Sequence, residues 1–390
     1  MIQRIKLPFD VKRPILACGA DLKGAFAFAK GKKAFLAGGF GDLGDLDNFM
    51  RYEKAVKKLR RKLGIKPQII ACDLHPGYFS SKFAESFQQD CSRAHLSVPY
   101  KCMLRRIQHH EAHIASAIID NNIKGDCIGV AFDGTGYGSD RNIWGGEFFI
   151  GGLKGFKRAA HLEYVPMPGG EMAIKEPWRM AASYLYHAFG NKLPASLKRW
   201  REKDMAILKT MIERKINSPL TSSAGRLFDG VGSLLLSKDH ISKEAELPVE
   251  LERLASGHSC GKYKFDIRTS ERDCIIGISA IIKEIVKDVS KKINKSEISC
   301  KFHNTISDAI LKTSLILSKK FKLKQVVLRG GVFQNRYLTA RTVEALRTRG
   351  LEVYTHSHIP ANDSGIPIGQ IAIANAQHQS GAGQARATCA

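Results

Sequence analysis

Two histidines one helical turn apart are the first candidates for metal chemistry in this sequence. His109 and His113 lie in the run QHHEAH, and the apolar residues after it recur at helical spacing. Helical residues four apart have Cβ atoms about 5–6 Å apart, so two imidazoles can share one ion. Capping or surface histidines give the same short pattern, because histidine has many structural roles. His110, between the two, is the candidate catalytic residue.

Two aspartates could complete a metal site. Asp133 follows the apolar run 128–132 and precedes a glycine-rich stretch, an arrangement suited to holding a cation beside phosphate oxygens. Asp363 precedes the last expected helix. A glycine-rich hairpin turn is the ordinary explanation for the first aspartate, and a helix N-cap for the second. Two imidazoles with two carboxylates would make a mixed nitrogen and oxygen site suited to iron or zinc.

A second glycine turn and a further aspartate could contact a nucleotide. Gly330 and Gly331 separate a short apolar strand from a helix that begins near Asn335. Glycine lets a ligand approach the backbone, and a helix N-terminus favours an anion, although a plain strand-to-helix turn has the same pattern. Asp229 lies on an expected helix, where its carboxylate could accept a hydrogen bond from a ribose hydroxyl or simply face solvent.

These residues lie on elements that alternate between strand and helix, as in an α/β protein. The segment 15–36 predicts a three-stranded antiparallel meander, and a similar pattern recurs over 127–165, which indicates two similar lobes. We expect strands at 68–72, 325–328 and 352–355, and helices at 48–63, from about 80, at 109–120, 177–190, 196–215, 222–236, as a pair over 273–320, at 335–349 and at 365–376.

Composition limits the class of protein further. The chain has 390 residues, of which 44% are apolar, enough for a sizeable core. Because no apolar run approaches the ~20 residues of a membrane span and the N-terminus lacks a signal-peptide pattern, we expect a cytoplasmic protein without a membrane partner. Nine cysteines without a CxxC pair indicate reduced thiols. A net charge of +24 favours anionic partners, and the basic stretch 51–66 predicts a solvated helix face or a docking face for a partner.

Taken jointly, these motifs resemble the actin-like ATPase superfamily, which includes the universal tRNA threonylcarbamoyl-transferase. Within it, the chain is most similar to the C-terminal (Kae1-like) domain of the hydrogenase-maturation carbamoyltransferases, the HypF family. The resemblance extends over residues 13–376. It is carried, in this order, by RPILACGADLK, DLHPGY, QHHEAH, VAFDGTGYG, IWGGEF, PGGEMAIKEPWRMA, TSSAGRLFD, GGVFQN and NDSGIPIGQ.

The resemblance implies two RNase H-like lobes with a nucleotide cleft between them. We divide the chain into an N-terminal extension (1–14), lobe I (15–128 plus 360–376), lobe II (129–359) and a disordered tail (377–390). The metal ligands implied are His109, His113, Asp133 and Asp363. The residues expected to line an adenine nucleotide, either ATP or carbamoyl-adenylate, are Gly134, Thr135, Gly136, Asp229, Gly330, Gly331 and Asn335.

The family reaction moves a carbamoyl group from carbamoyl-adenylate to the C-terminal cysteine of a partner, HypE. Full-length relatives carry acylphosphatase, zinc-finger and adenylate-forming modules ahead of this domain, so the resemblance implies a YrdC-like, adenylate-forming partner for this chain. Two other functions stay open: a small-molecule O-carbamoyltransferase, and an RNA-associated protein that retains the fold. If the chain carries out the carbamoyl transfer of hydrogenase maturation, we expect no nucleic-acid partner.

The chain departs from the family pattern at three places. Glu111 stands where the family usually has a histidine, and Arg329 where it has a serine. The run 243–246 reads Lys-Glu-Ala-Glu in place of Tyr-Glu-Gly-Gln. Ala245 therefore adds a Cβ where the backbone is expected to approach the ribose, and Arg329 is expected to add a phosphate contact.

Overall fold

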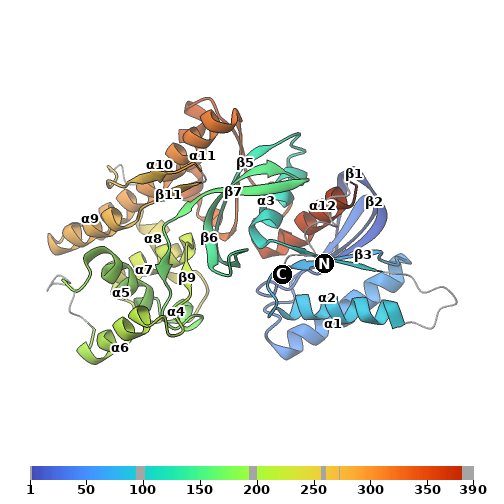
Figure 1. The fold of residues 1–390 in the computed structure, drawn as a ribbon, viewed down its shortest axis with the longest axis horizontal. Helices are drawn as coiled ribbons and strands as arrows, with labels where there is room; N and C mark the ends of the chain where they lie inside the picture. The colour runs from blue at the N-terminus through green and yellow to red at the C-terminus, as the bar shows by residue number, and fades with distance from the viewer. Residues whose placement is uncertain (1, 94–101, 193–199, 256–260, 272, 380–390) are drawn as a thin grey trace.

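The chain is built on two β-sheets that lie in two parts of the molecule (Figure 1). A computed structural model describes residues 2–93, 102–192, 200–255, 261–271 and 273–379. One sheet has four strands in the order β2-β1-β3-β4, and the other has nine, with the path β10-β11-β7-β6-β5-β12-β13 and with β8 and β9 off that path. Within the described residues, no helix is both long and apolar enough to span a bilayer.

The four-stranded part begins with a long antiparallel hairpin. Its strands are β1 (Ile2–Ala17), β2 (Phe26–Ala37), β3 (Ile69–Asp73) and β4 (Met103–Ile107). The expected three-stranded meander is wrong, because β2 continues through Gly31, whose φ of +60° absorbs a register shift opposite Val11 without turning the chain. The expected N-terminal extension is, from Ile2 onward, part of β1.

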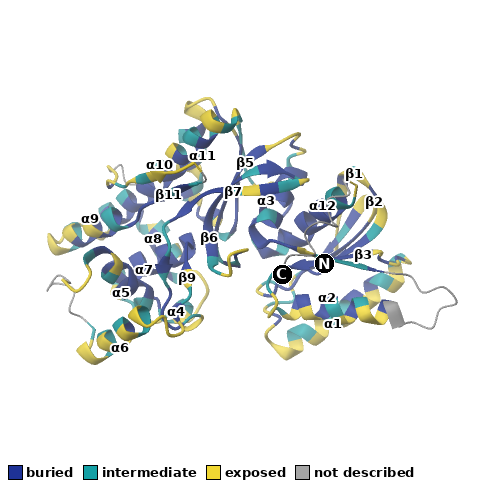
Figure 2. Cartoon of the chain, viewed as in Figure 1, coloured by how far each residue is buried: buried dark blue, intermediate teal, exposed yellow. Residues whose placement is uncertain are grey.

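Helices α1 (Leu46–Leu63) and α2 (Phe79–Arg93) belong to this part. Asp45 caps α1 by accepting a hydrogen bond from the Asn48 amide, and Gly64 ends it in the left-handed conformation. The buried face of α1 consists of Tyr52, Val56 and Leu59. Its basic residues are mostly exposed, as the solvated-face interpretation predicts, and Figure 2 shows the exposed outer side of the helix.

The nine-stranded part contains the second meander, and here the expectation is confirmed. Strands β5 (Cys127–Tyr137), β6 (Ile143–Gly152) and β7 (Gly155–Leu162) pair antiparallel in sequence. The parallel strands β12 (Gln325–Arg329) and β13 (Glu352–Tyr354) extend the sheet beyond β5. The remaining strands are β8 (Val165–Pro166), β9 (Leu220–Thr221), β10 (Ile267–Thr269) and β11 (Cys274–Ile276).

Helices cover this sheet. They are α4 (Met172–Lys175), α5 (Trp178–Phe189), α6 (Glu202–Glu213), α7 (Ala224–Leu236), α8 (Glu246–Ala255), α9 (Ser279–Ser290), α10 (Lys295–Phe321), α11 (Arg336–Thr348) and the 3-10 helix η2 (Gly331–Gln334). The helical pair expected from 273 starts only after β11. Residues 196–199 of the expected helix 196–215 lie outside the described residues.

Two apolar helices lie side by side where the two parts meet (Figure 1). Helices α3 (His109–Asp120) and α12 (Ile366–Gln379) are buried over most of their length, and α3 also packs on β5 and β12. Their backbones cross so closely that a Cβ built on Gly369 would lie 1.8 Å from the carbonyl oxygen of Ala112. Helix α12 continues to Gln379, and residues 380–390 of the expected tail lie outside the described residues.

Candidate metal and nucleotide site

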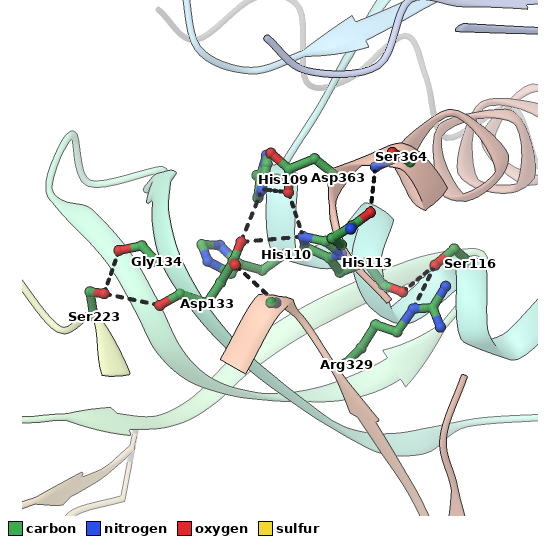
Figure 3. Close-up of polar contacts among 12 residues, drawn as sticks. His109, His110, His113, Ser116, Asp133, Gly134, Ser223, Arg329, Asp363 and Ser364 are labelled. Atoms are coloured by element: carbon green, nitrogen blue, oxygen red, sulfur yellow. Dashed lines mark hydrogen bonds and ion pairs between the residues drawn. The ribbon is translucent and has the colours of Figure 1, made fainter. Parts of the chain in front are cut away.

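Four buried side chains from three segments converge at the junction of the two parts (Figure 3). His109 and His113 lie on α3, Asp133 on β5, and Asp363 at the start of the 3-10 helix η3 (Asp363–Gly365). One nitrogen or oxygen atom of each lies within 4.8 Å of the other three. Both imidazole Nε2 atoms are 3.3 Å from Asp133 Oδ2. They are 3.6 Å (His109) and 3.4 Å (His113) from Asp363 Oδ1.

Local structure explains why each side chain reaches this point. Gln108 caps α3, so both histidines lie inside the helix and fully buried, which excludes capping or surface roles for them. In β5 the register shifts between Phe132, opposite Gly146, and Gly136, opposite Trp144, so three residues of β5 face one residue of β6. Such a bulge re-aims a side chain, and here Asp133 lies on it. Asn362, not Asp363, caps η3, which leaves the Asp363 carboxylate available to the cluster.

Asp73, at the end of β3, orients one of the histidines. Its Oδ2 lies 2.7 Å from His109 Nδ1, so the other ring nitrogen points into the cluster. Metal-binding histidines typically donate their second ring N–H to a carboxylate in this way. We did not single out Asp73 from the sequence, although it follows the apolar run QIIAC as Asp133 follows its own strand. An aspartate at the end of a buried strand was therefore the signal available.

Opposite charges dominate the electrostatics of the cluster. Burial alone disfavours the charged imidazole, but Asp363 and Asp73 raise the pKa of His109 well above its usual value. Burial likewise opposes ionisation of the aspartates, yet the two imidazoles hold the pKa of Asp133 well below its usual value and lower that of Asp363 to about 2. Two carboxylates thus stay ionised in a buried site, where a cation compensates them.

The donor set fits one divalent ion. Two imidazole nitrogens and two carboxylate oxygens are ligands that iron and zinc accept. Neither ring nitrogen of His113 makes a well-aligned hydrogen bond among the described residues, and such unpartnered buried atoms are costly unless a ligand satisfies them. The carboxylate behind His109 adds the outer contact that such sites use.

The glycine-rich part of β5 and the glycine turn before η2 meet at Asp133, and the expected hairpin turn directly after Asp133 is absent because β5 continues to Tyr137. Asp133 Oδ1 accepts a hydrogen bond from the Gly331 amide at 3.0 Å, while Oδ2 faces the imidazoles. Gly330 has a φ of +104°, and a Cβ there would lie 2.2 Å from the Phe132 carbonyl oxygen, so close backbone approach requires glycine. Gly134 and Thr135 are half-buried and remain accessible to a ligand.

Two other predicted nucleotide contacts, Gly136 and Asn335, are packed against or bonded to other residues of the chain. Gly136 is buried, and a Cβ there would lie 2.4 Å from His110 Cε1, so this glycine makes room for that ring. Asn335 caps α11 through Oδ1, and its Nδ2 lies 2.9 Å from Nε2 of the buried His303. Both polar atoms of the Asn335 side chain are therefore already bonded within the protein.

Asp229 lies on α7 and is buried, so the surface alternative is wrong for this residue. Its Oδ2 is 2.7 Å from Arg226 Nη2, but neither oxygen accepts a well-aligned hydrogen bond among the described residues. Burial raises the pKa of Asp229, and Arg226 offsets part of that effect. The first turn of α7 contacts β5 at Gly134, since a Cβ on Gly225 would lie 2.7 Å from Gly134 Cα.

His110, the candidate catalytic residue, is fully buried beside the cluster, with its ring centroid 5.4 Å from that of His109. Nδ1 lies 3.1 Å from Gln108 Nε2, and Nε2 makes no hydrogen bond among the described residues. Burial, and then the neighbouring His109, lower the pKa of His110 well below its usual value. The ring is therefore neutral at pH 7, and because Nδ1 accepts from the Gln108 amide, its one N–H is on Nε2 and can donate to a ligand.

Arg329 does not take the place expected from the sequence. Its side chain is fully buried and donates to Ser116 Oγ and to the carbonyl oxygens of Ile359 and Pro360. The expected phosphate contact is therefore wrong, because the guanidinium donates to the loop before Asp363. In Figure 3 it points toward Ser116 and away from Asp133.

Ala245 has a φ of +57°, a left-handed conformation that strains an L side chain. We expect Ala245→Gly to raise the free energy of unfolding by about 1 kcal/mol, because glycine adopts this conformation without the Cβ clash. Chemical denaturation measures the change. Ala206→Gly, on the exposed face of α6, is the matched control and should lower stability by about 1 kcal/mol, and a loss of similar size at both sites would contradict strain at Ala245.

The fold and the histidine–aspartate cluster together define a Kae1-like domain, and two family models match accordingly. The model described as "HypF Kae1-like domain" matches residues 10–120. The model described as "Carbamoyltransferase, Kae1-like Domain, second subdomain" matches residues 129–370, more than half of the chain. The chain belongs to the HypF family.

Individual relatives agree with this assignment. Carbamoyltransferase HypF2 of Cupriavidus necator is 31% identical over 92% of this chain and 46% of its own length. A carbamoyltransferase HypF homolog of the same organism is 31% identical over 93% of this chain and 92% of its own length. The chain thus spans about half the length of HypF2 and nearly all of the HypF homolog.

A solved structure shows the same fold. The crystal structure of full-length HypF in the phosphate- and nucleotide-bound form superposes with a TM-score of 0.87 at 36% identity. The match covers 96% of this chain and 57% of that chain. The α/β fold expected from the sequence is therefore confirmed.

Proposed function

We propose that this chain transfers a carbamoyl group from carbamoyl-adenylate to the C-terminal cysteine of a HypE-like acceptor in hydrogenase maturation. The observation that carries the proposal is the position of Asp133. One carboxylate oxygen faces both imidazoles, and the other accepts from the Gly331 amide, so the metal cluster and a glycine turn share one residue. Membership of the HypF family and the likeness to a nucleotide-bound HypF support an adenine nucleotide at this junction.

In the proposed reaction, the acceptor thiolate forms a bond to the carbamoyl carbon, and the bond from that carbon to the AMP phosphate oxygen breaks. The acceptor thiol loses its proton to solvent before the attack. His110 is neutral, and because its Nδ1 accepts from Gln108 Nε2, its ring proton is on Nε2, from which it donates to the carbamoyl oxygen. The backbone of Gly134 and Thr135 faces the phosphate side, and Asp229 accepts from the ribose. Backbone amides that face the developing charge stabilise the transition state.

His109, His113, Asp133 and Asp363 hold the ion in this proposal. An iron or zinc ion bound there supplies Lewis acidity toward the carbamoyl oxygen. Asp73 keeps the His109 ring oriented by accepting from Nδ1, and burial of all four ligands keeps competing water away from the reacting carbonyl.

A transfer assay tests the proposal. The chain is loaded with metal and incubated with carbamoyl-adenylate and a peptide that carries a C-terminal cysteine, and the adduct is detected by mass spectrometry. We expect a thiocarbamate on the cysteine. Transfer to an aminoglycoside but not to the peptide would contradict the proposal and favour small-molecule O-carbamoylation.

The role of Asp229 gives a separate prediction. Asp229→Asn should weaken adenine-nucleotide binding about 10- to 100-fold, because a hydrogen bond to a charged acceptor contributes about 1.5–3 kcal/mol. Calorimetry with a non-hydrolysable ATP analogue measures the affinity, and metal content should stay unchanged. Asp308→Asn, at a mostly buried aspartate paired with Lys262 at 2.7 Å, is the control and should bind nucleotide normally. Equal loss of nucleotide and metal in D229N would indicate a folding defect and contradict a ribose contact.

A further inference from the structure

Asp363 is the cluster residue with the least regular support. The other three lie on a long helix or a central strand, whereas Asp363 follows the irregular segment 355–362 that connects β13 to η3. Its distance from His113 therefore depends on what holds that segment. Two charged side chains hold the segment: Asp120 binds its amides, and Arg329 binds its carbonyl oxygens.

The amides of the segment are held by Asp120 at the C-terminal end of α3. Its carboxylate accepts from the amides of Ser357 at 2.7 Å, His358 at 2.9 Å and Ile359 at 3.2 Å. The neighbouring Asn121 donates to the Thr355 carbonyl oxygen at 2.8 Å. The helix that carries both histidines thus also holds the first part of the loop that leads to Asp363.

The carbonyls that follow are held by Arg329. Nη2 donates to Ile359 O at 3.0 Å and to Pro360 O at 2.6 Å, and Nε donates to Ser116 Oγ at 3.1 Å. Ser116 in turn donates to the His113 carbonyl oxygen at 2.7 Å. One guanidinium therefore connects the helix that carries His113 to the loop that carries Asp363. Figure 3 shows the first half of this link, from Arg329 through Ser116 to His113.

The packing around this guanidinium leaves little freedom. Arg329 is the largest fully buried side chain of the described residues. A Cβ built on Gly365 would lie 2.3 Å from Pro360 O and 3.1 Å from Arg329 Nη2, so η3 folds back tightly onto the arginine. Burial lowers the pKa of Arg329 to about 10, so the side chain remains charged at neutral pH, with Asp120 as the opposing charge.

We propose that Arg329 is a positioning residue for Asp363, which it holds at the distance from His113 that a divalent ion requires. The inference rests on the metal site of the proposed function. This role takes the place of the expected phosphate contact. It also gives a reason for an arginine where the family pattern has serine, because a serine side chain is too short to reach the loop and hold it by direct hydrogen bonds. Loss of a hydrogen bond made directly to a metal ligand typically weakens metal affinity about 10- to 100-fold. We expect an effect in this range for Arg329, which acts on its ligand through the backbone of the loop.

The test compares Arg329→Ser and Arg329→Lys with the wild-type chain. Zinc affinity is measured by competition with a chromophoric chelator, and hydrogen exchange is measured for the amides of 357–365. We expect R329S to bind zinc about 10- to 100-fold more weakly and to exchange faster over 357–365. R329K should be intermediate, because a single ammonium can replace only some of the hydrogen bonds that the guanidinium donates. Arg347→Met is the matched control, since Arg347 donates to the Val353 carbonyl oxygen away from Asp363, and its zinc affinity should not change.

Wild-type zinc affinity in R329S, or weakening of the same size in R347M, would overturn the proposal. If R329S does not fold, Ser116→Ala removes the link from Arg329 to α3 while the arginine remains, and it should weaken zinc binding in the same direction; an unchanged affinity would overturn the proposal. A wild-type chain that binds neither zinc nor iron would instead contradict the metal site itself, so the two failures are distinguishable.

Discussion

Replacing His113 with alanine should remove most of the bound metal and nearly all carbamoyl transfer. His113 Nε2 lies 3.3 Å from Asp133 Oδ2 and 3.4 Å from Asp363 Oδ1, so it faces both carboxylates of the cluster. Its loss leaves one imidazole for two buried carboxylates, and removing one partner from buried charges typically costs about 3–5 kcal/mol. Elemental analysis of the purified variant, followed by the transfer assay, measures both effects.

The control for this variant is a buried histidine outside the cluster. His161 on β7 is 5% exposed, and its Nδ1 lies 2.7 Å from the Leu162 carbonyl oxygen. His161→Ala should keep its metal even if it loses some stability. Unchanged metal content in H113A would show that the helix histidines are structural, whereas equal metal loss in both variants would point to general unfolding.

The candidate site was predictable where one short pattern determines local structure. The run QHHEAH gives helical spacing directly, and a helix places His109 and His113 on one face. An apolar run followed by aspartate predicted Asp133 on a buried strand, although β5 continues past it to Tyr137. The same pattern precedes Asp73, which was not among the predicted residues. The convergence of these segments with Asp363 came from resemblance to a family, because spacing along the chain does not fix distances in space.

The errors have a common physical origin in tertiary contacts. Gly31 was read as a turn, but pairing with the long strand β1 keeps β2 extended through it. The sequence predicts a phosphate contact for Arg329, whereas the structure buries its side chain. Its burial depends on two carbonyl oxygens 30 and 31 residues later in the chain, which no local pattern reveals. Asn335 stays a predicted nucleotide contact, and its bond to His303 on another helix is likewise one that no local pattern reveals.

The 390-residue chain alone should form no carbamoylated acceptor from carbamoyl phosphate and ATP, but should do so from carbamoyl-adenylate. Forming the adenylate requires one site that hydrolyses carbamoyl phosphate and a second that joins carbamate to ATP. Among the described residues a single histidine–aspartate group could hold a metal, and both glycine-rich segments meet at its Asp133. The two matching family models are both Kae1-like units.

The two substrate conditions are compared in parallel, with the same acceptor peptide and the same metal-loaded protein. Adding an adenylate-forming, YrdC-like protein to the first condition should restore the product, which shows that the acceptor and the transfer step are intact. Robust product from carbamoyl phosphate and ATP without any second protein would contradict a transfer-only chain. No product even from carbamoyl-adenylate would contradict the proposed function. If the wild-type chain is inactive with carbamoyl-adenylate but Ala245→Gly is active, the strained Ala245 is the cause of the lost activity. That substitution removes one Cβ and leaves the metal ligands unchanged.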